Sequence, residues 1–298
     1  MRGELLAHVL IQKVWMILVA LSCAHSLAQP FYSYRRNILD EFVVAAGPVP
    51  SVRSETPDEN STARVRCAIP AGTILPVRLN STVSSAKSKP GQMITGRIMQ
   101  EVPLSSGIRI KEGSKVVGHI VEVTPASTGK TARISLQFDK LIWGDQTISI
   151  ATSLRAIAGF MRINEAQTPP IGPGESDVYR WLTTVQIGGD IVYGEGGPVT
   201  TANDPNDVVG KAVYGGVLSQ VRASQDAKCR GATDGNEAPQ ALWVFSSDAC
   251  GTYGLEHISI VSAGRSGVTG VIVFSSDRQN LKIRGGAGML LRINKNRY

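Results

Sequence analysis

One segment of the chain ends like a phosphate-binding loop, Thr124-Pro-Ala-Ser-Thr-Gly-Lys-Thr131. Such a loop needs a glycine at its first position, where Thr124 stands, and a following helix whose N-terminal amides hold the phosphates. The residues from Arg133 onward alternate between polar and apolar types, which predicts a strand instead. We therefore interpret the segment as an exposed turn, and the sequence predicts neither nucleotide nor any other cofactor.

Two histidines, His119 and His257, lie beyond the first 28 residues, and a histidine can act as a general base. His257 follows a glutamate, and a Ser-His-carboxylate arrangement would need Ser259 or Ser262 as its nucleophile. The Gly-x-Ser-x-Gly elbow that marks such a serine is incomplete, because Gly264-Arg-Ser-Gly267 is one residue short. His119 falls on the polar side of its predicted strand and is expected to face solvent. The sequence therefore predicts no catalytic residues, and a secreted hydrolase remains an alternative.

The patterns that would bind a metal ion are also incomplete. Two histidines without a Cys-x-x-Cys pair do not form a usual zinc site. Asp204, Asn206 and Asp207 place oxygen ligands close together but lack the rest of a calcium loop. The sequence therefore predicts no metal site, and the cluster is interpreted as an ordinary turn, with ion binding as the alternative.

The N-terminus has the pattern of a secretory signal peptide. Two basic residues precede an apolar run, Val14–Leu21, and small residues follow it before Ala28. We expect cleavage between Ala28 and Gln29, so that residues 1–28 are removed and the protein is exported to the periplasm or the outer cell envelope. The apolar run is too short to cross a bilayer, which favours removal over the alternatives of a retained anchor or a lipoprotein.

Export would place the remaining cysteines in an oxidising compartment. Three cysteines follow the predicted cleavage position, Cys67, Cys229 and Cys250. Cys229 and Cys250 flank a polar loop and one β-rich run, and we predict that they form a disulfide. In the chain-entropy model, closing a loop of this size contributes on the order of 3 kcal/mol. Cys67 would compete for either partner or remain a buried thiol.

The composition indicates a mainly β protein that can bury a large core. The chain has 298 residues, of which 42% are hydrophobic, and its 31 glycines and 15 prolines are spread through short apolar runs. The formal charge of +7 fits an acidic envelope surface as well as simple solubility. The sequence contains no block of basic residues and no basic stripe interleaved with aromatic residues, so we predict no nucleic-acid partner.

Three segments of the chain share one pattern. In each, an isoleucine is followed three residues later by a glycine, then by a small residue and an apolar alternation: Ile69–Leu79, Ile110–Ile120 and Ile283–Ile293. An alternation of period two predicts a strand with one buried face, and the glycine supplies the positive φ of a tight turn. We expect the turn glycines to share a positive φ: Gly72, Gly113 and Gly286. We expect the first apolar residues after them to enter one core: Leu75, Val116 and Met289.

Strand patterns are dense in the first half of the predicted domain and return near its end. Six short runs between residues 66 and 150, each bounded by turn residues, indicate a β-barrel or sandwich. Residues 29–65 are polar and broken by prolines, which predicts a flexible linker before a β domain over residues 66–298. Further β-rich runs follow: Ala241–Phe245, His257–Val261 and Gly270–Phe274.

The order of several pieces resembles the C-terminal β domain of the TrbI/VirB10 family. The pieces are Ile69-Pro-Ala-Gly-Thr73, Lys89-Pro-Gly-Gln92, Ile110-Lys-Glu-Gly-Ser114 and Ser135-Leu-Gln-Phe-Asp-Lys-Leu141. The resemblance covers residues 66–150, and residues 283–294 are similar to the strand with which such domains finish. Those proteins are non-enzymatic scaffold subunits of type IV secretion and conjugation channels, and they form rings in the cell envelope.

The resemblance implies a non-enzymatic envelope scaffold that forms homo-oligomers and contacts other envelope proteins. Family members carry a cytoplasmic tail, a membrane span and a long periplasmic arm, where this chain has a predicted signal peptide and a short linker. The alternative is a monomeric extracytoplasmic module that binds a ligand or acts in adhesion. The two interpretations differ in the mass of the protein in solution.

Residues 151–225 interrupt the strand pattern and are predicted to form a helical and loop insertion. Ser176 could begin a helix whose apolar residues are spaced at i, i+3, i+4 and i+7, up to Val185. A second helical face is predicted over Asp207–Val221. In the resembled family a helical pair at a comparable place lines a membrane pore, which implies a membrane contact through residues 176–221. The short, glycine-rich segments favour packing across a barrel mouth instead.

Overall fold

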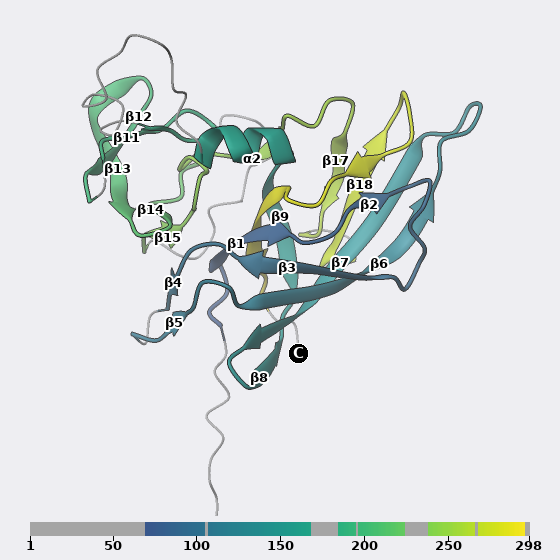
Figure 1. The fold of residues 1–298 in the computed structure, drawn as a ribbon, viewed down its shortest axis with the longest axis horizontal. Coiled ribbons are helices and arrows are strands. Elements are labelled where there is room, and N and C mark those ends of the chain that lie inside the picture. The colour runs from purple at the N-terminus through teal and green to yellow at the C-terminus, as the bar shows by residue number, and fades with distance from the viewer. Residues whose placement is uncertain are drawn as a thin grey trace, which may run out of the picture. The chain divides into compact units, whose positions relative to one another are not determined.

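The computed structural model describes residues 69–104, 107–167, 184–194, 196–223, 238–265 and 268–295. All of them belong to the compact unit Ala63–Tyr298. The predicted signal peptide with its cleavage position Ala28–Gln29, the linker, Cys67 and Cys229 lie outside the described residues. Within these residues the chain is mainly β with one short helix, which confirms the predicted fold class (Figure 1).

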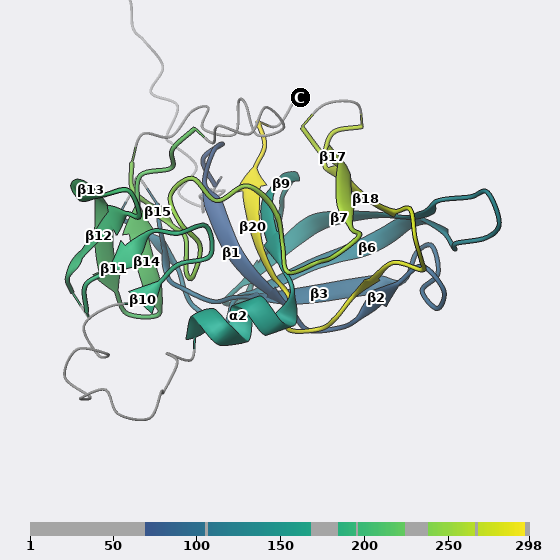
Figure 2. The same ribbon diagram turned by 90° about the horizontal axis from the view of Figure 1, so that it is seen from above.

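A ten-stranded sheet forms the larger part of the fold, in the order β16-β9-β20-β1-β3-β6-β7-β18-β17, with β8 beside β7. Its strands are β1 (Ile74–Leu79), β3 (Met93–Ile98), β6 (Lys115–Thr124), β7 (Ala132–Trp143), β8 (Gln146–Ser149), β9 (Thr152–Ala158), β16 (Gly251–Tyr253), β17 (Ser259–Ala263), β18 (Val271–Ser276) and β20 (Gly288–Ile293). Neighbouring strands are antiparallel except β16 and β9. The sheet curls, as Figure 2 shows, and the Asn294 side chain after β20 donates to the Gly264 carbonyl after β17 (3.1 Å).

The three repeated segments start strands of this one sheet, namely β1, β6 and β20. Their turn glycines have φ values of 89°, 82° and 88°, at Gly72, Gly113 and Gly286. The apolar residues Leu75, Val116 and Met289 all belong to the core enclosed by the curled sheet. The structure thus confirms the geometry that the repeat predicts, and β20 pairs directly with β1.

A six-stranded antiparallel sheet forms the second layer, in chain order from β10 to β15. Its strands are β10 (Thr184–Val185), β11 (Ile191–Val192), β12 (Pro198–Thr201), β13 (Asp204–Val213), β14 (Gly216–Ser219) and β15 (Gln240–Ala241). One face packs against β9, β20 and the helix α2 (Phe160–Gln167) through a second core that includes Val199, Val217, Ala156, Ile163 and Leu290. Two small pairs complete the described strands: β2 (Val83–Ser84) with β19 (Lys282–Ile283), and β4 (Val102–Pro103) with β5 (Arg109–Ile110).

The helical face predicted over Asp207–Val221 is wrong, because this segment forms the hairpin of β13 and β14. A bulge in the pairing of β12 with β13 leaves an extra residue on β13. An extra residue shifts the alternation of faces. The buried residues Val209 and Ala212 are consequently three positions apart, which imitates the period of a helix. The described end of the other predicted helix is β10, and the rest of it lies outside the described residues.

The helix α2 was not predicted because only Ile163 of its eight residues is buried. It begins after Gly159, whose carbonyl accepts the Ile163 amide (3.1 Å). A single buried position gives no amphipathic pattern to detect.

The strand predicted over Ala241–Phe245 is also wrong beyond Ala241. The Phe245 amide donates to the Leu242 carbonyl (2.9 Å), which closes a turn. Trp243 inside this turn has φ of 55°, a conformation rarely adopted by residues other than glycine. The segment is nevertheless fully buried, so its apolar composition resembles that of a core strand.

The turn glycines Gly113 and Gly286 should differ in their sensitivity to a methyl group. A Cβ on Gly113 would meet no atom within 4 Å, whereas a Cβ on Gly286 would lie 2.5 Å from the Phe160 ring. We expect Gly113→Ala to lower the free energy of unfolding by about 1–2 kcal/mol through φ alone. Gly286→Ala should lower it by roughly 1–3 kcal/mol more, because α2 must move. Urea unfolding measures the free energy of unfolding of both variants. Equal losses in the two variants would contradict the close packing of Phe160 against Gly286.

Candidate functional site

The residues of the considered catalytic triad are not brought together. His257 lies exposed in the turn before β17 with φ of 63°. Among the described residues, no hydrogen bond joins it to Ser259 or Ser262. The Ser262 hydroxyl instead donates to the Val271 carbonyl (3.5 Å) and accepts from the Gly264 amide (3.3 Å). The arrangement offers no activated serine.

The segment Thr124–Thr131 forms the hairpin loop between β6 and β7. The Lys130 amide donates to the Ser127 carbonyl (2.9 Å), and a strand follows the loop directly. The predicted turn is confirmed. On the neighbouring strands, His119 Nδ1 lies 3.0 Å from Asp139 Oδ2, with both side chains partly exposed, so the expectation that His119 faces solvent holds in part.

The acidic residues considered as calcium ligands are engaged with protein groups. Asp204 Oδ1 accepts the Asn206 amide (2.8 Å). Asp207 Oδ2 accepts both the Arg222 guanidinium (2.6 Å) and the Thr201 hydroxyl (3.3 Å). In the part of the chain that the structure describes, no three His, Cys, Asp or Glu side chains are placed to hold a metal ion.

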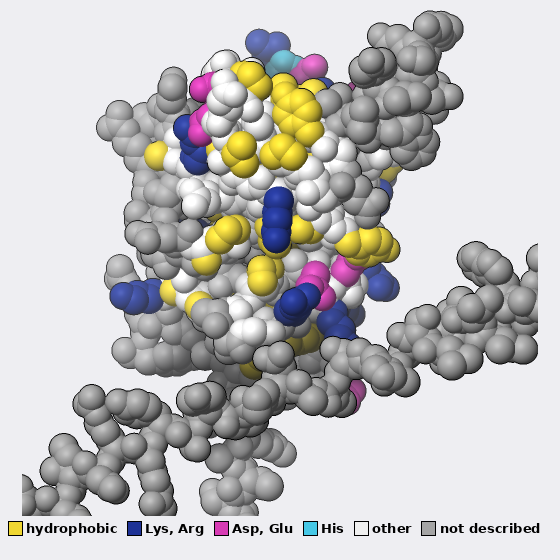
Figure 3. Space-filling view, turned by 90° about the vertical axis from the view of Figure 1, so that its left-hand side faces the viewer, with side chains coloured by type: hydrophobic (Ala, Val, Ile, Leu, Met, Phe, Trp, Pro, Cys, Tyr) yellow, Lys and Arg dark blue, Asp and Glu magenta, His cyan; other side chains and the backbone are white. Residues whose placement is uncertain are grey.

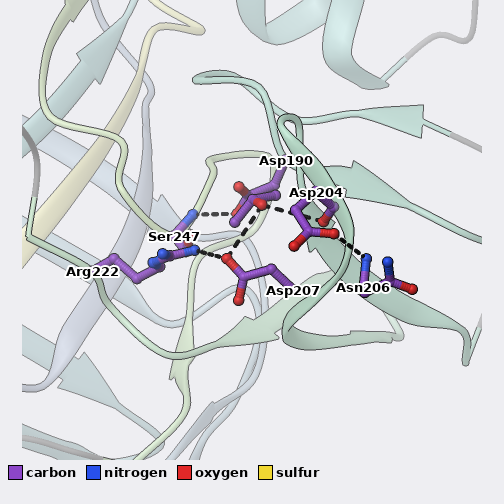
Figure 4. A network of polar contacts seen from close by, with 7 residues as sticks. Asp190, Asp204, Asn206, Asp207, Arg222 and Ser247 are labelled. Atoms are coloured by element: carbon purple, nitrogen blue, oxygen red, sulfur yellow. Dashed lines mark hydrogen bonds and ion pairs between the residues drawn. The ribbon is translucent and has the colours of Figure 1, made fainter.

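A cluster of hydrogen-bonded polar side chains lies where β9 meets the second layer. We call it the polar junction, and it comprises Arg155, Asp190, Asp207, Arg222 and Ser247 (Figure 4 shows all but the first). Arg155 and Asp190 are 1% and 4% exposed. The five residues come from β9, the turn before β11, β13 and two irregular segments, so the junction ties five parts of the fold together.

A β-bulge directs Arg155 to this place. On β20, Leu290 pairs with Ala156 and the next residue, Leu291, pairs with Leu154, so that Arg155 is the extra residue of β9. A bulge reverses the alternation of side chains along a strand. Leu154 therefore enters the first core, whereas Ala156 enters the second. The guanidinium of Arg155 extends in the same direction as the Ala156 side chain, toward the second layer.

The Arg155 guanidinium donates to backbone carbonyls of two separate segments. Its Nη2 lies 2.9 Å from the Arg222 carbonyl and 3.0 Å from the Ser247 carbonyl. The Arg222 amide also donates to the Ser247 carbonyl (2.9 Å). Arg222 then reaches outward to Asp207. The guanidinium thus links β9 to both irregular segments at once.

Asp190 holds the same segment from the opposite side. Its Oδ2 accepts the Ser247 amide (2.6 Å). The turn that carries it, Gly188-Gly189, approaches so closely that a Cβ on Gly188 would overlap the Ser246 hydroxyl. The Ser246 amide donates to the Ile187 carbonyl (2.9 Å), which extends the contact. A glycine at 188 is required for this approach.

Burial governs the electrostatics of the junction. Burial, with the charge of Arg265 as the second cause, lowers the pKa of Arg155 to about 10. Arg155 therefore stays charged at neutral pH. Burial likewise raises the pKa of Asp190, while its hydrogen bonds from Ser247 act in the opposite direction. Burial thus opposes the charged form of both groups, and hydrogen bonds offset part of that desolvation cost.

This geometry is suited to joining structural elements. The oxygen and nitrogen atoms named above form hydrogen bonds with backbone groups or with each other. No two of the five residues form a pair of nucleophile and general base. Sequence reasoning missed the junction, although one signal was present. Arg155 is the only charged residue in Thr152–Ala158, a strand that is buried at every position.

No protein-family model matches the chain, and no curated protein matches it either. Among the described residues, none of the helical structure is long and apolar enough to span a membrane. Of the two cysteines predicted to form a disulfide, Cys250 precedes β16 and its amide donates to the Tyr253 hydroxyl (3.1 Å). Because Cys229 lies outside the described residues, the Cys229–Cys250 disulfide stays a prediction.

Loss of the buried guanidinium should be far more damaging than loss of an exposed one. Arg155→Ala removes the donor for two buried carbonyls, and we expect the free energy of unfolding to fall by roughly 3–5 kcal/mol. Arg162→Ala removes an exposed pair with Glu165 and should cost less than about 0.5 kcal/mol. Chemical denaturation compares the two variants. Similar losses would show that Arg155 is not a tie between the layers.

Asp190 should make stability depend on pH. The pKa of Asp190 in the folded protein is raised above the ordinary 3.8. The stability that Asp190 contributes to the folded protein is therefore fully present below pH 3.8 and is lost as pH rises through the raised pKa. Asp190→Asn keeps an oxygen acceptor for the Ser247 amide but cannot ionise. We therefore expect the free energy of unfolding of Asp190→Asn, relative to that of wild type, to increase between about pH 4 and pH 7.

The measurement is urea unfolding across that pH range, with the exposed Asp145→Asn variant as the matched control. Parallel pH profiles for wild type and Asp190→Asn would contradict the prediction. Asp190→Ala, which leaves the Ser247 amide without this acceptor, should be destabilised at every pH.

Proposed function

We propose that this protein is a non-enzymatic, exported scaffold of the cell envelope that assembles with copies of itself. The pairing of β1 with β20 is the observation that supports this best. It joins residues 66–150 and 283–294, the two parts that resemble the TrbI/VirB10 β domain, in one sheet. That is the arrangement expected if the last strand finishes the domain. The role in secretion, with other envelope proteins as partners, follows from the resemblance and belongs to the same proposal.

The N-terminal pattern supports export to the periplasm or the outer envelope, with cleavage after Ala28. Both hydrophobic cores are built from residues 74 to 293. The chain beginning at Gln29 therefore contains every residue of the described cores. A Cys229–Cys250 disulfide would suit the same compartment.

The outer face of the six-stranded sheet is a surface suited to self-association. Val185 pairs with Ile191, which pairs with Thr200, which pairs with Val208, so these residues form one row across four strands. Val185 and Val208 at the two ends of the row are 64% and 59% exposed, Ile191 is partly exposed, and Thr200 between them is buried. We call this row the subunit face. Figure 3 looks onto this end of the molecule and shows groups of hydrophobic side chains with basic and acidic side chains among and around them.

An aromatic side chain adds to the apolar character of this face. The Tyr193 amide donates to the Pro198 carbonyl (3.1 Å), so both lie in the next row, where Lys211 pairs with Pro198. Tyr193 is exposed. Exposed apolar surface of this kind, rimmed by polar groups, is typical of protein interaction sites. The same side chains could receive a ligand, so the subunit face also supports the alternative of a monomeric binding module.

Light scattering of the chain beginning at Gln29 separates these functions. We expect a mass above that of one chain, increasing with concentration. Val208→Asp would place an unpaired charge in the contact and should weaken association at least tenfold, which corresponds to about 1.4 kcal/mol.

The matched control is Val268→Asp, at an exposed valine outside the subunit face. It should leave the mass unchanged. A strict monomer at all concentrations would overturn the scaffold proposal and favour the binding module, whereas equal effects of both variants would exclude the subunit face as the contact.

A further inference from the structure

The outer face of the curled sheet carries a row of like charges on adjacent strands. Arg78 of β1 pairs with Arg97 of β3, and Arg97 pairs with Lys115 of β6. Each is next to buried core residues in its strand, so all three side chains point away from the core. Directly paired residues have Cβ atoms about 5 Å apart.

Lys140 of β7 extends the row. It pairs with Val117, two residues after Lys115, which makes Lys140 and Lys115 diagonal neighbours. Arg97, Lys115 and Lys140 are exposed, and Arg78 is partly exposed. We call these four residues the basic row. It draws on four strands that are spread over more than sixty residues of sequence.

Two acidic side chains that are close in sequence to the basic row are directed elsewhere. Asp139 is paired with His119. The carboxylate of Glu112 lies toward Gly215 of the β13–β14 turn, where a Cβ would be 3.6 Å from it. Within the described residues, none of the four cations of the row has an ion-pair partner. Like charges at paired positions destabilise a sheet, so the row carries an unfavourable interaction that an anionic partner would relieve.

We propose that the basic row is a docking surface for anionic lipid headgroups. Four long cationic side chains on one sheet face can reach a common plane of phosphate groups. Met93, which pairs with His119 two rows away on the same face, is 65% exposed and offers an apolar side chain to the headgroup boundary. The surface lies on the main sheet and does not include the subunit face.

The neighbouring positions favour headgroups over nucleic acid. The next row toward Met93 contains Asn80, Thr95 and Val117. None of these side chains is aromatic, whereas surfaces that bind single-stranded nucleic acid commonly stack bases on aromatic rings. Charge attraction to a lipid surface needs no such platform, because affinity follows the number of basic residues near the surface.

The proposal is tested by sedimentation with vesicles. The chain beginning at Gln29 is mixed at low salt with vesicles of phosphatidylcholine alone or with one-third phosphatidylglycerol. We expect binding to the anionic vesicles only, and loss of binding as salt is raised. The double variant Arg97→Gln, Lys115→Gln should bind roughly 30-fold more weakly.

The control removes the same charge elsewhere. Arg109→Gln with Arg162→Gln replaces two exposed arginines that are paired with Glu101 and Glu165. It should change vesicle binding less than about threefold, because these cations are already neutralised. Equal losses in both double variants would overturn the proposal, since binding would then follow net charge alone.

Two further measurements keep the test decisive. The Arg97→Gln, Lys115→Gln variant should unfold at equal or higher urea concentration than wild type, because it relieves cross-strand repulsion. This result separates lost binding from lost folding. Absence of binding to anionic vesicles, with tight binding of an oligonucleotide or an acidic peptide through the same two residues, would overturn the proposal in favour of another partner. Val208→Asp is expected to weaken association of the subunits. Repeating the vesicle measurement with this variant therefore separates binding by the basic row of one chain from the avidity of an oligomer.

Discussion

The fold depends on satisfying the backbone of one irregular segment that is completely buried. Residues Gln240 to Ser247 lie between the two sheets, and only the first two belong to a strand. A buried peptide group without a hydrogen bond costs about as much as a lost hydrogen bond, so each amide and carbonyl here needs a partner. Neither sheet can supply all of them through its own ladder. Backbone groups satisfy some of them, such as the Val217 carbonyl that accepts the Leu242 amide, and buried side chains satisfy others, which makes the junction of the two layers specific.

Three such side chains come from distant parts of the chain, namely Gln100, Arg155 and Asp190. The Gln240 side chain accepts the Ile74 amide of β1 (3.0 Å), and the Gln100 side chain accepts the Trp243 amide (2.6 Å). Gln100 also donates to the Val217 carbonyl of β14 (2.8 Å). Arg155 completes the set at Ser247. Since each bond is directional, the six-stranded sheet cannot slide over β1 and β9 without breaking several at once.

The parts of the fold that follow from local patterns could be predicted from the sequence. A glycine before an alternating strand identifies β1, β6 and β20, because both signals are contained within eleven residues. The prediction of a helix over Asp207–Val221 was wrong because a bulge on β13 spaces its buried residues three positions apart, which resembles the period of a helix. The polar junction and the basic row escaped prediction for a different reason. Arg78, Arg97 and Lys115 become neighbours only through strand register, which no single segment encodes.

The neighbouring positions of β1 and β20 also determine when the protein can fold. A chain that emerges from its N-terminus presents β1 long before residues 288–293 are present, so one edge of β1 has no partner during that time. An unpaired apolar edge is prone to wrong pairing, and sheets built from distant segments form slowly. The main sheet is completed only when nearly the whole chain has emerged. If the protein is exported as we propose, such a delay postpones completion of the main sheet until the chain has crossed the membrane.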